Sequence, residues 1–239
     1  MRLFEAKDLT KKYDKTVLNH LDFSIDEGEV VGISGCGKST LARLVSGIEK
    51  PSSGSLLYQG KTVDFKKSRK DIQLILQNSI ESFSPRMKIK GFLYEPYHYF
   101  YHLTQKEALD CIKKILKQVG MDESCLEKYP HELSGGQLQR IAIARALIIQ
   151  PRLLICDEIT SSLDQVIQRE IIELLKQFVE KYHISILFIS HDLSLVHEFC
   201  HQILVLNDGK IIEKGTIQQL YKSENEVVQN LLKAAYLNG

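Results

Sequence analysis

A glycine-rich segment near the start of the chain has the residue types and spacing of a phosphate-binding loop. Residues 32–40 read Gly-Ile-Ser-Gly-Cys-Gly-Lys-Ser-Thr and fit the pattern G-x-x-x-x-G-K-[ST]. Glycines allow the backbone to turn so that its N–H groups converge on phosphate oxygens at the N-terminus of a helix. We expect Lys38 to neutralise the β- and γ-phosphates of a nucleotide and the Ser39 hydroxyl to bind Mg²⁺. The residues predicted to contact ATP in this segment are Gly32, Ser34, Gly35, Cys36, Gly37, Lys38, Ser39 and Thr40.

A second segment supplies two adjacent carboxylates. Residues 153–158 read Leu-Leu-Ile-Cys-Asp-Glu, an apolar strand that ends in two acids. Parallel sheets bind their ligands at the carboxyl ends of the strands. We expect Asp157 to bind Mg²⁺ and Glu158 to polarise the attacking water. Acids at a strand end often serve solubility only, so this interpretation depends on the phosphate-binding loop.

A third segment predicts a second anion site. Residues 133–137 read Leu-Ser-Gly-Gly-Gln, and a helical pattern starts at Leu138. A serine hydroxyl and free backbone N–H groups at a helix N-terminus favour an anion. One nucleotide rarely needs two phosphate-binding segments, which suggests that this one serves a nucleotide held by another subunit.

This third segment resembles the signature of ATP-binding cassette (ABC) domains, and the other cassette motifs follow in the expected order over essentially the whole chain. The resemblance implies that Tyr13 stacks on adenine, that Gln77 links the Mg²⁺ and water site to the transporter, and that His191 contacts the γ-phosphate. It also implies a head-to-tail dimer that encloses two ATP molecules, each held between the phosphate loop of one subunit and the signature of the other. The implied catalytic residues are Glu158, His191 and Gln77, the Mg²⁺ ligands are Ser39, Gln77 and Asp157, and further nucleotide contacts come from Tyr13, Ser134, Gly135, Gly136, Gln137 and Asp164.

One region resembles a particular group of transporters. Residues 77–87 resemble the corresponding stretch in importers of peptides, nickel and opine-type metallophores. The pair Glu95-Pro96 and residues 156–164 are similar to the nickel and metallophore branch of that group. The resemblance implies ATP-driven import of a small solute by a peripheral protein on the cytoplasmic face of the membrane. The implied partners are transmembrane permease subunits and a second ABC ATPase, either a copy of this chain or a related one. An extracellular solute-binding protein would act indirectly.

The elements that must position these motifs follow from the pattern of apolar residues. Apolar strands at 153–156 and 184–189 alternate with a helix at 165–182, which predicts a parallel sheet covered on both faces. With short strands before residue 31, the resemblance implies an α/β P-loop NTPase core with an N-terminal antiparallel β region. We predict one nucleotide-binding domain, 1–239, with its core at about 1–77 and 151–239. An inserted helical subdomain is predicted at about 78–150.

Composition narrows the alternatives. The chain has 31 basic and 30 acidic residues and a net charge of +1, so it has no bulk attraction to nucleic acid. No apolar stretch approaches the roughly 20 residues that span a bilayer, so partner chains would have to supply a pore. Five cysteines without a CxxC pair predict free thiols in a reducing compartment. The alternatives are a soluble cassette ATPase acting on nucleic acid or ribosomes, and a small-molecule kinase, which has little use for the signature.

Two features do not fit a simple pattern. Only Val30 and Val31 separate Gly28-Glu29 from Gly32, whereas a central strand needs about 5–6 residues. Either the strand or the loop is therefore short by about three residues, and we expect weaker Mg-ATP binding than in a variant with three residues inserted after Ile33. The second feature is the aromatic run 94–102, which predicts either a contact patch for the membrane partner or a helix that covers the subdomain.

Overall fold

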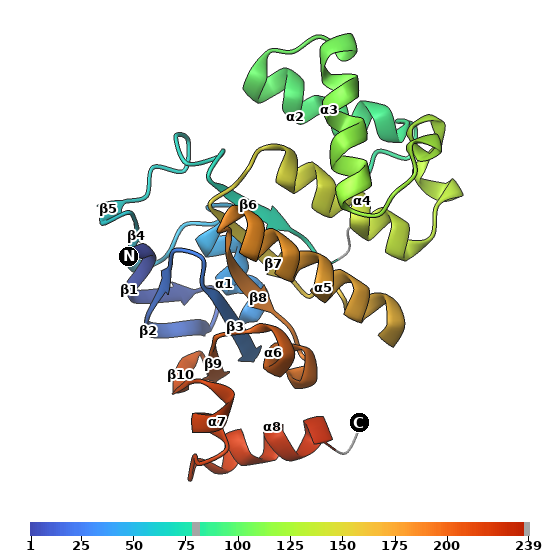
Figure 1. The fold of residues 1–239 in the computed structure, drawn as a ribbon. Helices are drawn as coiled ribbons and strands as arrows, with labels where there is room; N and C mark the ends of the chain where they lie inside the picture. Colours follow the sequence, from blue (N-terminus) through green and yellow to red (C-terminus); the bar gives the residue numbers. More distant parts are fainter. Residues whose placement is uncertain (78–81, 237–239) are drawn as a thin grey trace.

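Two sheets form the centre of the molecule in the computed structural model, which describes residues 1–77 and 82–236 (Figure 1). The first sheet is antiparallel, in the order β2-β1-β4-β5, and consists of β1 (Arg2–Lys12), β2 (Thr16–Asp26), β4 (Ser53–Tyr58) and β5 (Lys61–Thr62). The second sheet has the order β10-β9-β3-β8-β7-β6. Its strands are β3 (Val30–Gly35), β6 (Ile72–Ile75), β7 (Leu153–Asp157), β8 (Ser185–Ile189), β9 (Gln202–Asn207) and β10 (Lys210–Gly215). The predicted fold class is confirmed.

The second sheet is parallel except at one edge, where β10 runs antiparallel to β9. Successive side chains of a strand point to opposite faces. In β8, Ile186 and Phe188 belong to one buried cluster and Leu187 and Ile189 to another. The strands are apolar throughout because both of their faces are covered.

Helices cover the two faces differently. On one face lie α1 (Lys38–Val45) and the antiparallel sheet, and on the other lie α5 (Gln165–Tyr182) and α6 (Leu193–Phe199). After β10 the chain ends in α7 (Ile217–Leu220) and α8 (Glu226–Tyr236). Figure 1 shows α7 and α8 at the opposite end of the molecule from α2 and α3.

The segment between β6 and β7 is helical, as the sequence predicts. It contains α2 (Ile89–Tyr101), α3 (Gln105–Gln118), the 3-10 turns η2 (Glu123–Glu127) and η3 (Pro130–Glu132), and α4 (Gly135–Ile148). Thr104 caps α3 in a reciprocal pair of hydrogen bonds with Glu107, which is a capping box. One continuous cluster of buried side chains joins these helices to α5, α6 and the sheet, so they share a core with the rest of the chain. Residues 78–81, where the predicted boundary falls, lie outside the described residues.

The aromatic run lies on α2 and mostly faces inward. Tyr94 and Tyr97 pack against the core, and the Tyr101 hydroxyl donates to the Ile148 and Ile149 carbonyls at 3.4 and 3.3 Å. Among the tyrosines and the phenylalanine of this run, only Tyr99, with 63% of its surface exposed, is largely exposed. The structure therefore supports the covering-helix interpretation for three of these tyrosines. Within residues 1–77 and 82–236, no helix is long and apolar enough to cross a membrane.

Candidate functional site

Glu158 is the residue on which the predicted catalytic side chains converge. It follows β7 at the carboxyl edge of the parallel sheet, with φ 50°. Gln77 Nε2 donates to Glu158 Oε2 at 3.0 Å, and His191 Nδ1 lies 3.5 Å from the same oxygen. Lys38 Nζ lies 3.4 Å from Glu158 Oε1. Three residues from separate segments of the chain thus meet at the Glu158 carboxylate, as expected when strands β3, β6, β7 and β8 end at one edge.

Asp157 provides the second carboxylate, in a different environment. Its side chain is 5% exposed, and its Oδ1 atom has no hydrogen-bond partner among the described residues. Burial raises the pKa of Asp157, and a hydrogen bond from Ser39 acts in the opposite direction. A buried carboxylate oxygen without a partner, next to a hydroxyl, is the donor set that a hard divalent cation prefers. These two residues therefore fit Mg²⁺.

The structure shows which part of the phosphate-binding segment is short. Strand β3 runs from Val30 to Gly35 and has the length of a normal central strand, and α1 begins at Lys38. Only Cys36 and Gly37 connect them. The shortage of residues is in the loop, and the strand is complete.

This result corrects two expectations about the segment. Gly32 and Ser34, which were predicted to contact ATP, lie inside β3. A Cβ atom on Gly32 would approach Val196 Cγ1 to 2.6 Å, and only 2% of the surface of Ser34 is exposed. Both are in the buried sheet because β3 pairs with neighbours on both sides, so neither belongs to the turn before the helix. An insertion after Ile33 would likewise fall inside the strand, since Ile33 pairs with Ile189 and Leu204.

The last residue of β3, Gly35, and the first loop residue, Cys36, lie close against the neighbouring strand β9. Gly35 has φ 111°, and a Cβ atom there would approach the Leu206 carbonyl oxygen to 1.7 Å, so only glycine fits. The N–H of Cys36 donates to this same carbonyl at 3.4 Å. The Lys38 ammonium donates to the Gly35 carbonyl at 3.1 Å. The loop is thus tied to the sheet through its own polar groups.

The signature residues are not part of this cluster. Ser134 caps α4, accepting from the Gln137 N–H at 3.3 Å while its own N–H donates to Gln137 Oε1 at 3.0 Å. Both side chains are exposed, and Gly136 lies against Ile167 of α5. Figure 1 shows the N-terminus of α4 well apart from the junction of β3 and α1. Asp164 is also exposed, and its carboxylate caps α5 by accepting from Val166 and Ile167.

Tyr13, the predicted adenine contact, lies in the turn between β1 and β2 with half of its surface exposed. Its hydroxyl donates to Glu49, and this bond raises the pKa of Tyr13, whereas a hydrogen bond with Thr40 lowers it. Glu49 also pairs with Lys11 at 2.9 Å and with Arg43 at 3.6 Å. Sequence reasoning did not find Glu49, because a single acid in a turn carries no local signal.

In this site a strand is followed by a glycine-containing turn and by a helix that begins with lysine, and two acids end a strand of the same sheet. This arrangement defines a nucleotide-binding protein of the phosphate-loop class. A family model described as "ABC transporter" matches residues 18–161, more than half of the chain. The nickel import ATP-binding protein NikE of Shigella boydii serotype 4 (strain Sb227) is 40% identical over 238 residues, which cover 95% of this chain and 89% of that protein. The chain belongs to the ABC transporter family.

Solved structures agree with this assignment. The structure of cbiO1 from Clostridium perfringens, part of the ABC transporter complex cbiONQ, matches with a TM-score of 0.83 at 29% identity, covering 99% of this chain and 98% of that one. A dimeric ATP-binding cassette in a post-hydrolysis state, bound to ADP and Pi, matches with a TM-score of 0.77 at 28% identity, covering 90% and 99%. The chain is an ATP-binding, ATP-hydrolysing subunit of this family, and the non-transport alternative is disfavoured.

Proposed function

We propose that this chain powers the import of a small solute, namely a peptide, nickel or a metal–opine chelate, through a membrane ABC transporter. The observation that carries the proposal is the convergence of Lys38, Gln77 and His191 on Glu158. Relatives at about 40% identity are named for nickel import, so nickel is the first solute to test.

The roles of the site residues follow from their positions. Ser39 and Asp157 would hold Mg²⁺, with Gln77 beside them, and the ion would neutralise charge on the phosphates of ATP. Glu158 would orient and polarise a water molecule, and the contacts of Gln77 and His191 with its Oε2 atom support this role. Lys38 would move from Glu158 to the phosphates, and Tyr13 would contact adenine.

The proposed partners are transmembrane permease subunits and a second ABC ATPase. The exposed Ser134, Gly135, Gln137 and Asp164 would face the nucleotide of that second ATPase. A groove of about 550 Å³ between α2 and the segment before β6, lined by Phe65, Ile72, Tyr99 and Phe100 among others, would receive a cytoplasmic segment of the permease. The chain would then lie peripherally on the cytoplasmic face, and a solute-binding protein would act from the other side.

The test is solute uptake by cells that express the whole transporter with wild-type chain or with Glu158→Gln. We expect nickel uptake to fall at least tenfold in the variant, with this chain still purifying with membrane partners. Glu198→Gln is the matched control, because Glu198 is an exposed acid on α6 that pairs only with Lys176, at 3.1 Å, among the described residues. Parallel uptake assays with a dipeptide and with a nickel chelate separate the three solutes. A chain that purifies without membrane proteins, with uptake of all three unchanged, would overturn the proposal.

A further inference from the structure

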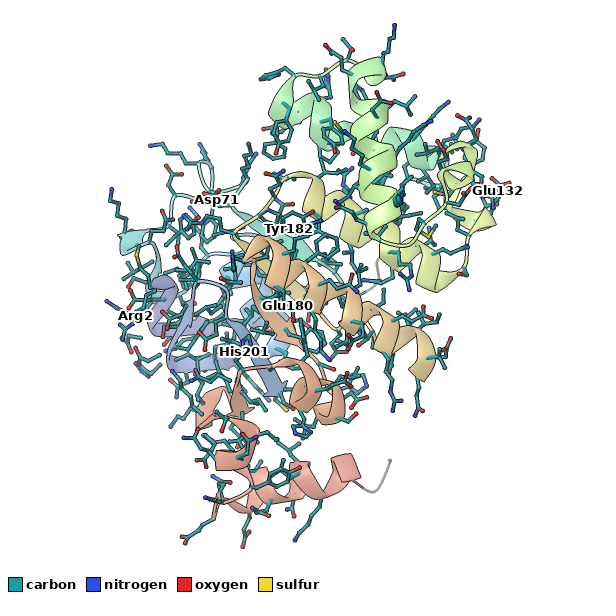
Figure 2. The ribbon with its side chains drawn as sticks, in the orientation of Figure 1. Arg2, Asp71, Glu132, Glu180, Tyr182 and His201 are labelled. Atoms are coloured by element: carbon teal, nitrogen blue, oxygen red, sulfur yellow. The ribbon has the colours of Figure 1, made fainter. Side chains whose placement is uncertain are left out.

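The position of β3 is determined along its whole length. At its start, the Val30 N–H donates to His201 Nδ1 and the Val30 carbonyl accepts from the His201 N–H, both at 2.9 Å. Figure 2 shows His201 beside β3. At its end, Gly35 pairs with Leu206. A slip by one residue would move Val31 and Ile33 to the wrong face of the sheet. The strand therefore cannot supply residues to the loop.

Because β3 keeps all of its residues, the phosphate-binding loop is shorter than the sequence pattern requires. In the pattern G-x-x-x-x-G-K, the residues between the two glycines form the loop that wraps the phosphates. Here the first part of that pattern, Gly32 to Gly35, is sheet. Cys36 and Gly37 span only about 7 Å of extended chain.

Some of the hydrogen-bond donors that remain for a phosphate group already have partners within the protein. The Cys36 N–H points to Leu206 of β9, and the Lys38 ammonium contacts the Gly35 carbonyl and Glu158. For an incoming triphosphate, the site offers the N-terminal turn of α1 and a lysine that must first leave these partners. Backbone N–H groups supply much of the phosphate affinity of such loops, so we expect this affinity to be low.

The other half of the machinery is complete. Gln77 and His191 contact Glu158, and Asp157 lies next to it. In the signature, Ser134, Gly135 and Gln137 are exposed at the start of the 14-residue helix α4. The chain thus combines a deficient phosphate loop with an intact surface for a nucleotide held by a partner. Two copies of this chain would form two deficient sites.

We propose that the two nucleotide sites of the assembled ATPase pair are unequal, because this chain's own loop of two residues between β3 and α1 holds ATP less tightly than a full-length phosphate loop on the partner ATPase. ATP held on the partner's loop, completed by Ser134 to Gln137 of this chain, fills at low ATP concentration. The site on this chain's own loop fills only at higher concentration. This inference rests on the proposed function, and it gives the order in which the two nucleotide sites fill.

The test is photolabelling of the purified transporter with 8-azido-ATP and Mg²⁺, followed by separation of the two ATPase chains on a gel. At low nucleotide concentration we expect the partner to be labelled at least tenfold more than this chain. Insertion of Gly-Ser-Gly between Gly35 and Cys36 should bring the labelling of this chain to within about threefold of the partner. The same insertion beside Gly60, where nothing lies within 4 Å of a Cβ atom, is the matched control and should label as wild type.

Three outcomes would overturn the inference. One is equal labelling of both chains in the wild type, and another is an active transporter whose two ATPases are identical copies of this chain. The third is a folded loop-insertion variant, with unchanged melting temperature, that labels no better than wild type. If that variant does not fold, the wild-type labelling ratio alone decides. A failure of the proposed function is distinguishable, because no complex with membrane subunits would then be available to label.

Discussion

Lys38 Nζ lies 3.4 Å from Glu158 Oε1, so the predicted phosphate-binding cation and the proposed catalytic carboxylate form an ion pair. Both side chains are mostly shielded, with 14% and 16% of their surface exposed. The same carboxylate also contacts Gln77 and His191. Lys38 must leave Glu158 to reach a γ-phosphate, and its departure would free one carboxylate oxygen for water. In the proposed mechanism, this ion pair would link nucleotide binding to the preparation of the proposed catalytic carboxylate.

We predict that Glu158→Gln lowers ATP hydrolysis by the isolated chain at saturating Mg-ATP by about 10² or more, as loss of a general base would. Nucleotide binding should persist, because an amide no longer holds Lys38 by charge. With ATP, the closed dimer should accumulate. The measurements are phosphate release and titration with a fluorescent ATP analogue, with Glu198→Gln as the control. Wild-type turnover in Glu158→Gln would show that another carboxylate is catalytic.

Ser134→Arg should leave ATP binding by the isolated chain unchanged but abolish dimer-dependent hydrolysis. The reason is that Ser134 is exposed and caps the N-terminus of α4, apart from the cluster around Lys38. Loss of the helix cap costs about 1 kcal/mol, which melting temperature will report. Gly136→Asp should act similarly, although its Cβ atom would also crowd Ile167 at 2.9 Å.

Gln177→Arg is the control for this experiment, because it adds the same charge to an exposed position of α5. ATP affinity and hydrolysis should both match wild type. If Ser134→Arg reduced the ATP affinity of the monomer as much as Lys38→Ala, the segment would belong to the chain's own nucleotide site.

Asp157→Asn should stabilise the protein in the absence of Mg²⁺, by about 1 kcal/mol at pH 8, because it removes a buried charge whose Oδ1 atom has no partner. Burial raises the pKa of Asp157, so ionisation costs folding free energy above that raised pKa. The cost vanishes as pH falls toward about 4, the usual pKa of aspartate. The stability difference between variant and wild type should therefore shrink on acidification.

Mg²⁺ provides the complementary measurement. It should raise the melting temperature of the wild type and leave Asp157→Asn unchanged. Asp110→Asn, at an exposed position of α3, should behave as wild type in both experiments. Equal Mg²⁺ stabilisation of wild type and Asp157→Asn would place the ion elsewhere.

Tyr99→Ala should weaken assembly with the membrane subunits without lowering the melting temperature, because Tyr99 is 63% exposed and lines the groove beside α2. The pair Tyr97→Ala and Tyr101→Ala should instead destabilise the fold by about 2 kcal/mol, since both side chains pack inward. Co-purification and thermal melting measure the two effects. Tyr182→Ala on α5 is the exposed aromatic control. Unchanged co-purification of Tyr99→Ala would show that this groove is not the docking surface.

The sequence by itself determined the chemistry and the class of fold. Each chemical motif is contained in a few consecutive residues, so its pattern is visible without coordinates. The motifs are the lysine and serine after Gly37, the two acids after a run of apolar residues, and the signature at the start of a helix. The apolar strands between helices also predicted the parallel sheet. A strand that is buried on both faces of its sheet needs apolar residues at nearly every position, and this too is visible in consecutive residues.

Only the tertiary structure decided questions that depend on contacts between distant segments. Pairing of β3 with β8 and β9 showed that the loop, and not the strand, is short. Gln77 and Glu158 meet although 81 positions separate them. Tyr97 faces inward and Tyr99 outward because α4 and the core lie on one side of α2. In each case the deciding neighbour lies far away in sequence, and residue type alone carries no record of it.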